Sequence, residues 1–356
     1  MGEITIRKLD GEIITFSVFG GFSEIETTIN KDILLRVLKE NNIAEKEVCM
    51  LKIISDSIEV SWGGQFAPFE SLTEVVLIAK TIIRLNCYNF KKSNVSRVSL
   101  QANEIWFNDG TFSDSERLEH VTCSGRILDG QHPNGLAEML FQNCPQLKTV
   151  RGIYKGIWLM PFVFQSCTSL EEPLDIYVKE LGFCAFENCQ SLKRIHLHNG
   201  LKSMGHSAFK DCSSLEDIYI PDTVTSLGVK TFCGCKNLRK IHLPKCISGI
   251  PEMVFMDCSR LEKVFLPDDI AIIGTMAFKG CNLLQRPWFP DGLKEIGEEA
   301  FRGCVSMREV FLPESLTIIG DNAFADCGQL IIHCKPGSYA EEYAKKNSIP
   351  FVTDLK

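Results

Sequence analysis

The sequence lacks the patterns that mark most enzymes and membrane proteins. No stretch reaches the roughly 18 apolar residues that a membrane-spanning helix needs. The motifs GxSxG, GxxxxGKS/T, HExxH and GxGxxG do not occur. Basic residues are too few for a typical phosphate-binding surface, because 38 Lys and Arg face 45 Asp and Glu. These absences count against an enzyme, a membrane-inserted protein and a nucleic-acid binder.

The first residues, MGEITIRKLDGEI, also lack the basic and then apolar stretch of a secretory signal. We therefore expect a cytoplasmic protein, although removal of a signal peptide from an extracellular protein would leave the same beginning. Cysteine is abundant, with 16 residues, yet no CxxC pair occurs. Zinc and dithiol sites thus have no local signature, and we expect no metal site and no cofactor.

What the sequence does contain is an internal repeat. Phenylalanine recurs in steps of 23 residues, with one step of 22, and a cysteine follows each one three places later. The phenylalanines are Phe141, Phe164, Phe186, Phe209, Phe232, Phe255, Phe278, Phe301 and Phe324. Leucine, or Met307 in one repeat, comes six places after each, and two apolar residues spaced by one follow it. Weaker copies around Phe66, Phe90 and Phe112 give about twelve units.

Such a unit predicts one short strand, a turn and a return segment. Stacked units share one core and form columns of identical side chains. The cysteine column is then buried, with each thiol acting as a small apolar filler and not as half of a disulfide. Four glycines occur where the chain turns back, and we expect them to adopt unusual dihedrals. They are Gly228, Gly274, Gly297 and Gly320.

The unit, read as AFxxCxxLxxIxLPxxLxxIG, resembles the BspA-like class of leucine-rich repeats over roughly residues 66–351. The ending CKPGSYAEEYAKKNSIPF is similar to the closing segment of such bacterial proteins. The resemblance implies an α/β-type repeat solenoid, a leucine-rich repeat with short parallel strands and units of about 23 residues. Members that are understood look like surface adhesins that bind host proteins, so the resemblance also implies a binding function.

The two ends do not follow the repeat. Asp10, followed by glycine, predicts a hairpin turn between two apolar runs. Asn30 can cap a helix over 31–40, and a strand is expected over 48–53. Near the C-terminus, 339–346 predicts a short amphipathic helix. The predicted division is an N-terminal α+β cap or β-grasp-like module at 1–49, the solenoid at 50–333, and a C-terminal cap at 334–356.

On each strand the residue between the two apolar positions points outward, because strand side chains alternate between faces. In six consecutive repeats this residue is aromatic or histidine, and we name the set the aromatic ladder: His196, Tyr219, His242, Phe265, Trp288 and Phe311. Two positions earlier lies the charged ladder: Arg194, Asp217, Lys240, Lys263, Arg286 and Glu309. Earlier repeats carry Val76, Ser99 and Thr122 at the aromatic position.

An exposed apolar stripe beside mostly basic charges is typical of protein interfaces. We therefore hypothesise a non-enzymatic protein-recognition module that binds another protein on its strand face. Phe265, Trp288 and Phe311 would anchor the partner, and the basic members of the charged ladder would steer an acidic group. Two alternatives remain. In the first, the ladder serves carbohydrate binding or adhesion by stacking on sugar rings. In the second, its rings stabilise the sheet of a structural, self-assembling spacer.

Overall fold

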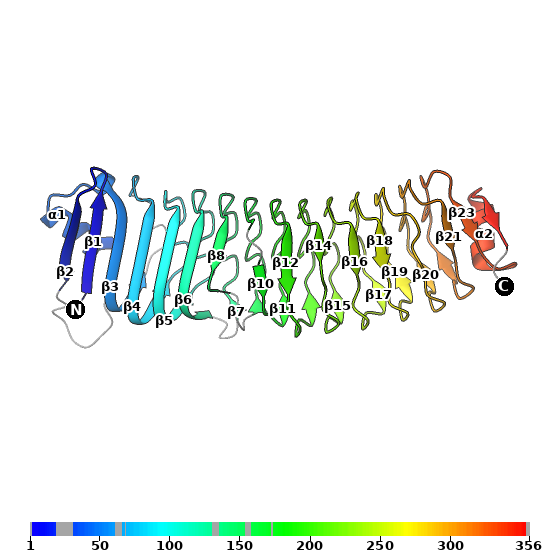
Figure 1. The fold of residues 1–356 in the computed structure, drawn as a ribbon, viewed down its shortest axis with the longest axis horizontal. Helices are drawn as coiled ribbons and strands as arrows, with labels where there is room; N and C mark the ends of the chain where they lie inside the picture. Colours follow the sequence, from blue (N-terminus) through cyan, green and yellow to red (C-terminus); the bar gives the residue numbers. More distant parts are fainter. Residues whose placement is uncertain are drawn as a thin grey trace. The chain divides into compact units, whose positions relative to one another are not determined.

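The computed structural model describes residues 2–18, 31–60, 66–67, 69–129, 135–153, 158–171 and 174–353. The chain folds as a parallel-strand β-solenoid of about 12 turns, about 23 residues apart, with little helix. The repeat prediction is thus confirmed. Contacts divide the chain into two compact units, Met1–Glu172 and Pro173–Lys356, named unit 1 and unit 2 (Figure 1).

Unit 1 begins with an antiparallel hairpin and continues as a parallel sheet. Its elements are β1 (Gly2–Lys8), β2 (Ile13–Val18), α1 (Lys31–Glu40), a single 3-10 turn (Glu45–Glu47), β3 (Val48–Val60), β4 (Glu74–Leu85), β5 (Arg97–Phe107), β6 (His120–Asp129), β7 (Gly135–Leu136), β8 (Thr149–Arg151) and β9 (Trp158–Leu159). Strand β1 pairs antiparallel with both β2 and β3. From β3 the sheet continues in parallel through β4, β5, β6 and β8. The proposed domain boundary after residue 49 therefore falls inside β3.

Strands β3 to β6 are 10 to 13 residues long, much longer than the short strands predicted. The pairing register shifts part-way along them, as it does between Ser55 and Ser57. Small buried residues lie at this irregularity, among them Ala79 and Ala102. A Cβ on Gly125 would collide with the carbonyl oxygen of Ala102. Small side chains thus let each strand continue past the bulge instead of ending there.

Unit 2 carries two short strands in most turns. Its elements are β10 (Leu174–Ile176), β11 (Glu180–Leu181), β12 (Arg194–Leu197), β13 (Ser203–Met204), β14 (Asp217–Ile218), β15 (Ser226–Leu227), β16 (Lys240–His242), β17 (Gly249–Ile250), β18 (Lys263–Phe265), β19 (Ile272–Ile273), β20 (Glu295–Ile296), β21 (Glu309–Phe311), β22 (Ile318–Ile319), β23 (Ile331–His333), α2 (Tyr339–Lys346) and β24 (Phe351–Val352). Most first strands pair in parallel with the first strand of a neighbouring turn, and so do most second strands, but in the described part of unit 2 no ladder joins β14 to β16, β18 to β21 or β15 to β17. A proline comes after the first strand in four turns, as Pro221 does, and Pro290 has the same place in a turn without a first strand; each begins the next segment without a backbone donor.

Columns of stacked side chains fill the core of each unit. Ring centroids of successive turns lie 4.8 to 5.2 Å apart from Phe66 to Phe164. From Phe186 to Phe324 the spacing is 5.2 to 5.7 Å. Each ring is therefore held between copies of itself, and the packing of one turn depends on the turns beside it.

The cysteine column is buried, as predicted. The Sγ of Cys144 donates to the carbonyl oxygen of Phe112 at 3.0 Å, and the same contact recurs through both units. In an earlier turn Ser115 occupies this position, and its Oγ donates to Phe90 at 3.0 Å. In these turns the position holds a small hydrogen-bond donor. Burial raises the pKa of the Cys144 thiol to about 12, which keeps it protonated at neutral pH.

The glycines at the return turn do not have the dihedrals expected from the sequence. None of Gly228, Gly274, Gly297 and Gly320 has a positive φ, so that prediction is wrong. Their role is steric. A Cβ on Gly297 would lie 2.6 Å from the backbone nitrogen of Thr275 in the preceding turn, and one on Gly274 would lie 2.8 Å from that of Glu252. Glycine is needed because the backbones of successive turns approach too closely for any side chain.

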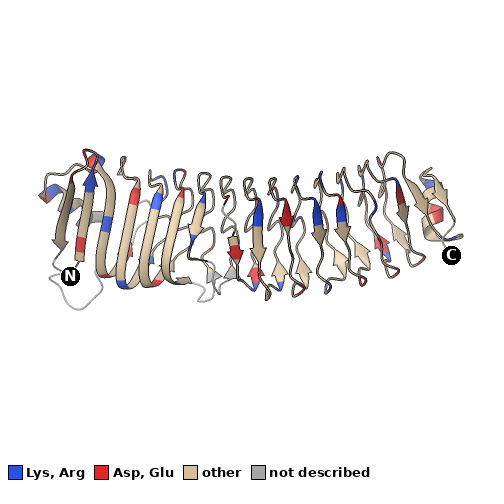
Figure 2. Cartoon of the chain, in the orientation of Figure 1, with Lys and Arg blue, Asp and Glu red and all other residues tan. Residues whose placement is uncertain are grey.

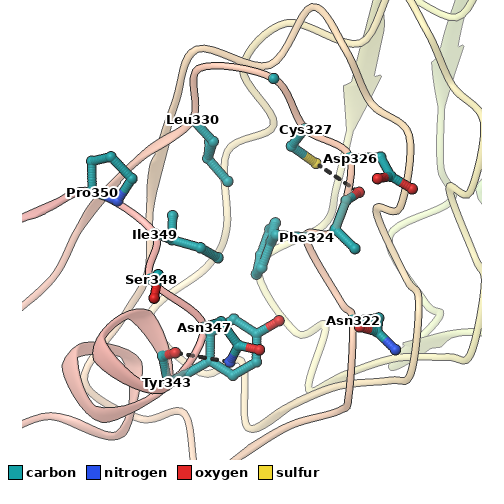
Figure 3. A pocket seen from close by; sticks show the side chains of 12 residues that line it. Asn322, Phe324, Asp326, Cys327, Leu330, Tyr343, Asn347, Ser348, Ile349 and Pro350 are labelled. Atoms are coloured by element: carbon teal, nitrogen blue, oxygen red, sulfur yellow. Dashed lines mark hydrogen bonds between the residues drawn. The ribbon is translucent and has the colours of Figure 1, made fainter.

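Both predicted end helices are confirmed. In α1, Leu34 and Leu38 are buried, whereas the predicted cap Asn30 lies outside the described residues. In α2, the buried ring of Tyr343 meets Phe324 edge-on at 6.1 Å and so closes the phenylalanine column. A cavity of about 490 Å³ remains between this helix and the last turn, lined also by Cys327 and Ile349 (Figure 3).

Substituting Gly297 tests the close approach of the turns. Gly297→Ala should lower the free energy of unfolding by about 1–3 kcal/mol, because the added methyl group must push two backbones apart. Gly292→Ala is the matched control, since nothing lies within 4 Å of its Cβ, and it should leave stability unchanged or slightly raised. Urea unfolding followed by circular dichroism measures both, and equal losses would contradict the steric explanation.

Alkaline pH should destabilise the protein through its buried thiols. The pKa of Cys144 rises from 9.0 to about 12 on burial, so between these values the thiol ionises only in the unfolded chain. The contribution of this thiol to the free energy of unfolding is complete below about pH 9. It is lost as pH rises toward 12, at about 1.4 kcal/mol per pH unit. The urea midpoint of Cys144→Ser should therefore fall less between pH 8 and 10.5 than that of wild type. Equal falls would show that this thiol does not contribute.

Candidate functional site

The first strands of unit 2 place the predicted ladders on one face. Arg194 lies opposite Asp217, and Lys240 lies opposite Lys263. The apolar residues that flank the aromatic ladder are buried, so the ladder side chains point outward as expected. The aromatic ladder is in register too: His242 pairs with Phe265 inside the sheet, and Tyr219 forms an isolated bridge with His242.

Exposure differs along the aromatic ladder. Tyr219 is 58% exposed, Phe265 46% and Trp288 57%. His196 and His242 are exposed as well, whereas Phe311 is half-buried. Exposure along the ladder is therefore uneven, and Phe311 is its least accessible member.

Trp288 is not held by a strand. Residues 286–288 occupy the strand position of their turn but form no ladder pairing. The cause is Pro287, which takes the first buried position of the repeat and has no N–H to donate to a neighbouring turn. The expectation of a strand here is thus wrong, although Trp288 still lies exposed.

Ring stacking within the sheet involves part of the ladder. The rings of His242 and Phe265 stack at 4.1 Å with an angle of 6° between their planes. Phe311 stacks on His333 at 4.3 Å, and the guanidinium of Arg286 lies 4.6 Å from its ring centre. These contacts stabilise the sheet. The Phe311 ring thus has contacts within the sheet, and its role as an anchor for a partner stays a prediction.

The charged ladder is neutralised in some places and not in others. Arg286 forms an ion pair with Glu309 at 3.2 Å, and Arg194 lies across from Asp217. Lys240 and Lys263 are like charges in direct register. Figure 2 shows this order along the strands that Figure 1 labels: β12 begins basic, β14 acidic, and β16 and β18 both basic.

Two residues that the repeat pattern does not reveal, Asp175 and His333, extend the ladder in both directions. Asp175 pairs in register with His196, and its Oδ1 lies 3.3 Å from the Nδ1 of that ring and 3.7 Å from the Nε2 of His198. At the other end His333 pairs with Phe311. The steps from Asp175 to His196 and from Phe311 to His333 are 21 and 22 residues, so a search at 23 residues passes over them.

The described residues give little support for a metal site, a reactive cysteine or a membrane-spanning helix. Within those ranges, no group of three or more His, Cys, Asp or Glu is arranged to hold a metal ion. Burial raises the pKa of the partly exposed Cys184 thiol to about 11, which disfavours a thiolate nucleophile. Neither of the two helices described is long and apolar enough to cross a membrane.

Comparison with known proteins agrees with the repeat geometry. The model of the BspA type leucine rich repeat region matches residues 53–171, 159–285 and 284–341, in six copies. The chain belongs to the BspA-type leucine-rich repeat family. No curated protein matches the sequence.

Solved structures of leucine-rich repeat proteins from several bacteria are similar to this family member. One from Bacteroides ovatus ATCC 8483 has a TM-score of 0.64 and 23% identity, over 83% of this chain and 83% of that chain. A leucine rich cell surface protein from Faecalibacterium prausnitzii A2-165 has a TM-score of 0.43 and 21% identity, over 80% and 84%. One from Eubacterium ventriosum ATCC 27560 has a TM-score of 0.48 and 18% identity, over 78% and 90%. The first likeness shows the fold alone.

Stability measurements can separate the ladder rings that stabilise the sheet from those that do not. Phe311→Ser should lower the free energy of unfolding by about 1–2 kcal/mol, because it removes the contacts with His333 and Arg286. Trp288→Ser should change it by less than about 0.5 kcal/mol, since that ring is exposed. Urea unfolding gives both values. A large loss for Trp288→Ser would mean that this ring, too, serves the fold.

Proposed function

We propose that the strand face of unit 2 is a non-enzymatic surface that recognises a partner protein. The observation that carries this proposal is the exposure of three large rings, Tyr219, Phe265 and Trp288, at 46–58% on one face of unit 2. Exposed aromatic side chains gathered beside charged ones are typical of interface hot spots. The stacked core holds the rungs of the sheet in place, which reduces the ordering cost of binding.

The arrangement of the rings favours a protein over a carbohydrate. Sugars bind aromatic side chains by stacking on ring faces. In the ladder, one face of Phe265 is covered by His242, and Phe311 lies against both His333 and Arg286. Stacked rings present their edges to a ligand, and apolar protein side chains pack readily against ring edges.

Carbohydrate binding stays the second candidate because of two other rings. Tyr219 is 58% exposed and Trp288 is 57% exposed. Neither has a ring contact within the described part of unit 2. They are three turns apart, roughly 14 Å if the rungs keep the strand spacing of a sheet. An extended glycan could stack on both, and a glycan array with the wild-type protein tests this alternative.

The remaining parts of the proposal follow from the sequence. The chain carries no motif of a catalytic site, so we propose binding without chemistry and without a cofactor. The cytoplasmic location, and the lack of nucleic-acid binding expected from a net charge of −7, stay predictions.

Affinity capture from a lysate of the source organism tests the recognition surface. The bait is the full chain, compared with a triple variant that carries Tyr219→Ser, Phe265→Ser and Trp288→Ser. We expect a partner protein to be recovered with the wild type and reduced at least tenfold with the variant, because the three rings supply the apolar contact.

The matched control changes three exposed apolar residues outside the ladder, namely Phe183→Ser, Ile272→Ser and Ile318→Ser. These side chains are 47–52% exposed, so the control alters a similar apolar surface of unit 2. It should recover the partner as well as wild type does. Equal recovery with the ladder variant would contradict the proposal, and binding of glycans alone would favour the second candidate.

A further inference from the structure

Lys240 and Lys263 are two like charges in register on the charged ladder. They stand directly opposite each other on neighbouring strands β16 and β18, and both are exposed. Like charges in this position destabilise a sheet. Arg286, the next member of the ladder after Lys263, forms an ion pair with Glu309. Asp217 precedes Lys240 by one turn. Among the described residues, neither lysine ammonium has an ion pair or a hydrogen bond.

An apolar platform lies beside the two ammonium groups on the same strands. The stacked rings of His242 and Phe265 come two residues after Lys240 and Lys263, so they point to the same side of the sheet. Phe265 remains 46% exposed despite the stacking. Two unneutralised cations and a ring pair thus form one small surface, which we name the lysine–ring subsite (Lys240, His242, Lys263 and Phe265).

We propose that the lysine–ring subsite binds an acidic, extended segment of the partner protein, with a carboxylate between Lys240 and Lys263 and an apolar side chain against Phe265. This inference rests on the proposed function of the strand face. Neighbouring strands are about 4.8 Å apart. One carboxylate can therefore accept hydrogen bonds from both ammonium groups, each at about 2.8 Å. Its binding removes the repulsion that the two lysines experience in the free protein.

The overall charge of the chain indicates a short acidic segment and not a long polyanion. The net charge is −7, which repels nucleic acids and sulfated or uronic glycans at distances beyond the subsite. A single carboxylate close to the two lysines experiences mainly their attraction. Charge complementarity thus assigns the carboxylate to Asp or Glu of a peptide, with hydrophobic residues beside it.

Selection from a library of random twelve-residue peptides tests this assignment. The full-length protein is the bait, and peptides that also bind the double variant K240Q/K263Q are removed. We expect the remaining peptides to be enriched in Asp and Glu. A chosen peptide should bind the double variant about tenfold more weakly, since each exposed charge contact contributes modestly. Its affinity should also fall as salt is raised from 50 to about 500 mM.

The control K236Q/K294Q removes the same charge from two exposed lysines outside the ladder and should bind the peptide like wild type. The assignment is overturned if no peptide is selected, or if the selected peptides are not acidic. It is also overturned if heparin or polygalacturonate binds the subsite and the peptides do not. Capture of a partner that depends on Tyr219, Phe265 and Trp288 but not on the lysine pair would leave recognition intact and refute only the acidic segment.

Discussion

Self-stacking from turn to turn is the constraint on which this structure depends. A phenylalanine of one turn packs against the phenylalanines of the turns beside it, and a neighbouring thiol donates to the backbone of the turn before. A side chain of another size would disturb both neighbours, because interiors are close-packed. The same closeness of the turns explains Gly297, whose Cβ would collide with Thr275. Core residues therefore repeat almost unchanged, whereas outward residues are free to differ.

That freedom explains why a function can reside on the strand face. The backbone positions of the ladder are set by the buried columns, so exchange of an outward side chain alters the surface without altering the fold. Sheet stability nevertheless uses some of these residues, since Phe311 lies between Arg286 and His333. Tyr219 and Trp288 have no such contact in the described part of unit 2. Part of the ladder thus serves the stability of the sheet, and the recognition that we propose uses the rings that do not.

Most of the fold could be predicted from the sequence because repetition and helix signals are local. The repeat period, the buried cysteines and the helices α1 and α2 are confirmed. The failures have local physical causes. Pro287 replaces the apolar residue that a strand would need, and Gly297 responds to a neighbouring turn that a single unit does not reveal. The long strands β3 to β6 depend on small residues at a bulge, which the repeat pattern does not contain.

The candidate site was less predictable, since it depends on which outward side chains contact one another. The sequence predicts one aromatic ladder, but only the structure separates stacked rings from accessible ones.

Hydroxyl-radical footprinting with and without a captured partner tests the central claim, that the accessible rings form the recognition surface. Tyr219, Phe265 and Trp288 should lose reactivity when the partner is bound, while Phe183, which is 52% exposed, should keep it. Protection of Phe183 with no change at the three ladder rings would contradict the account.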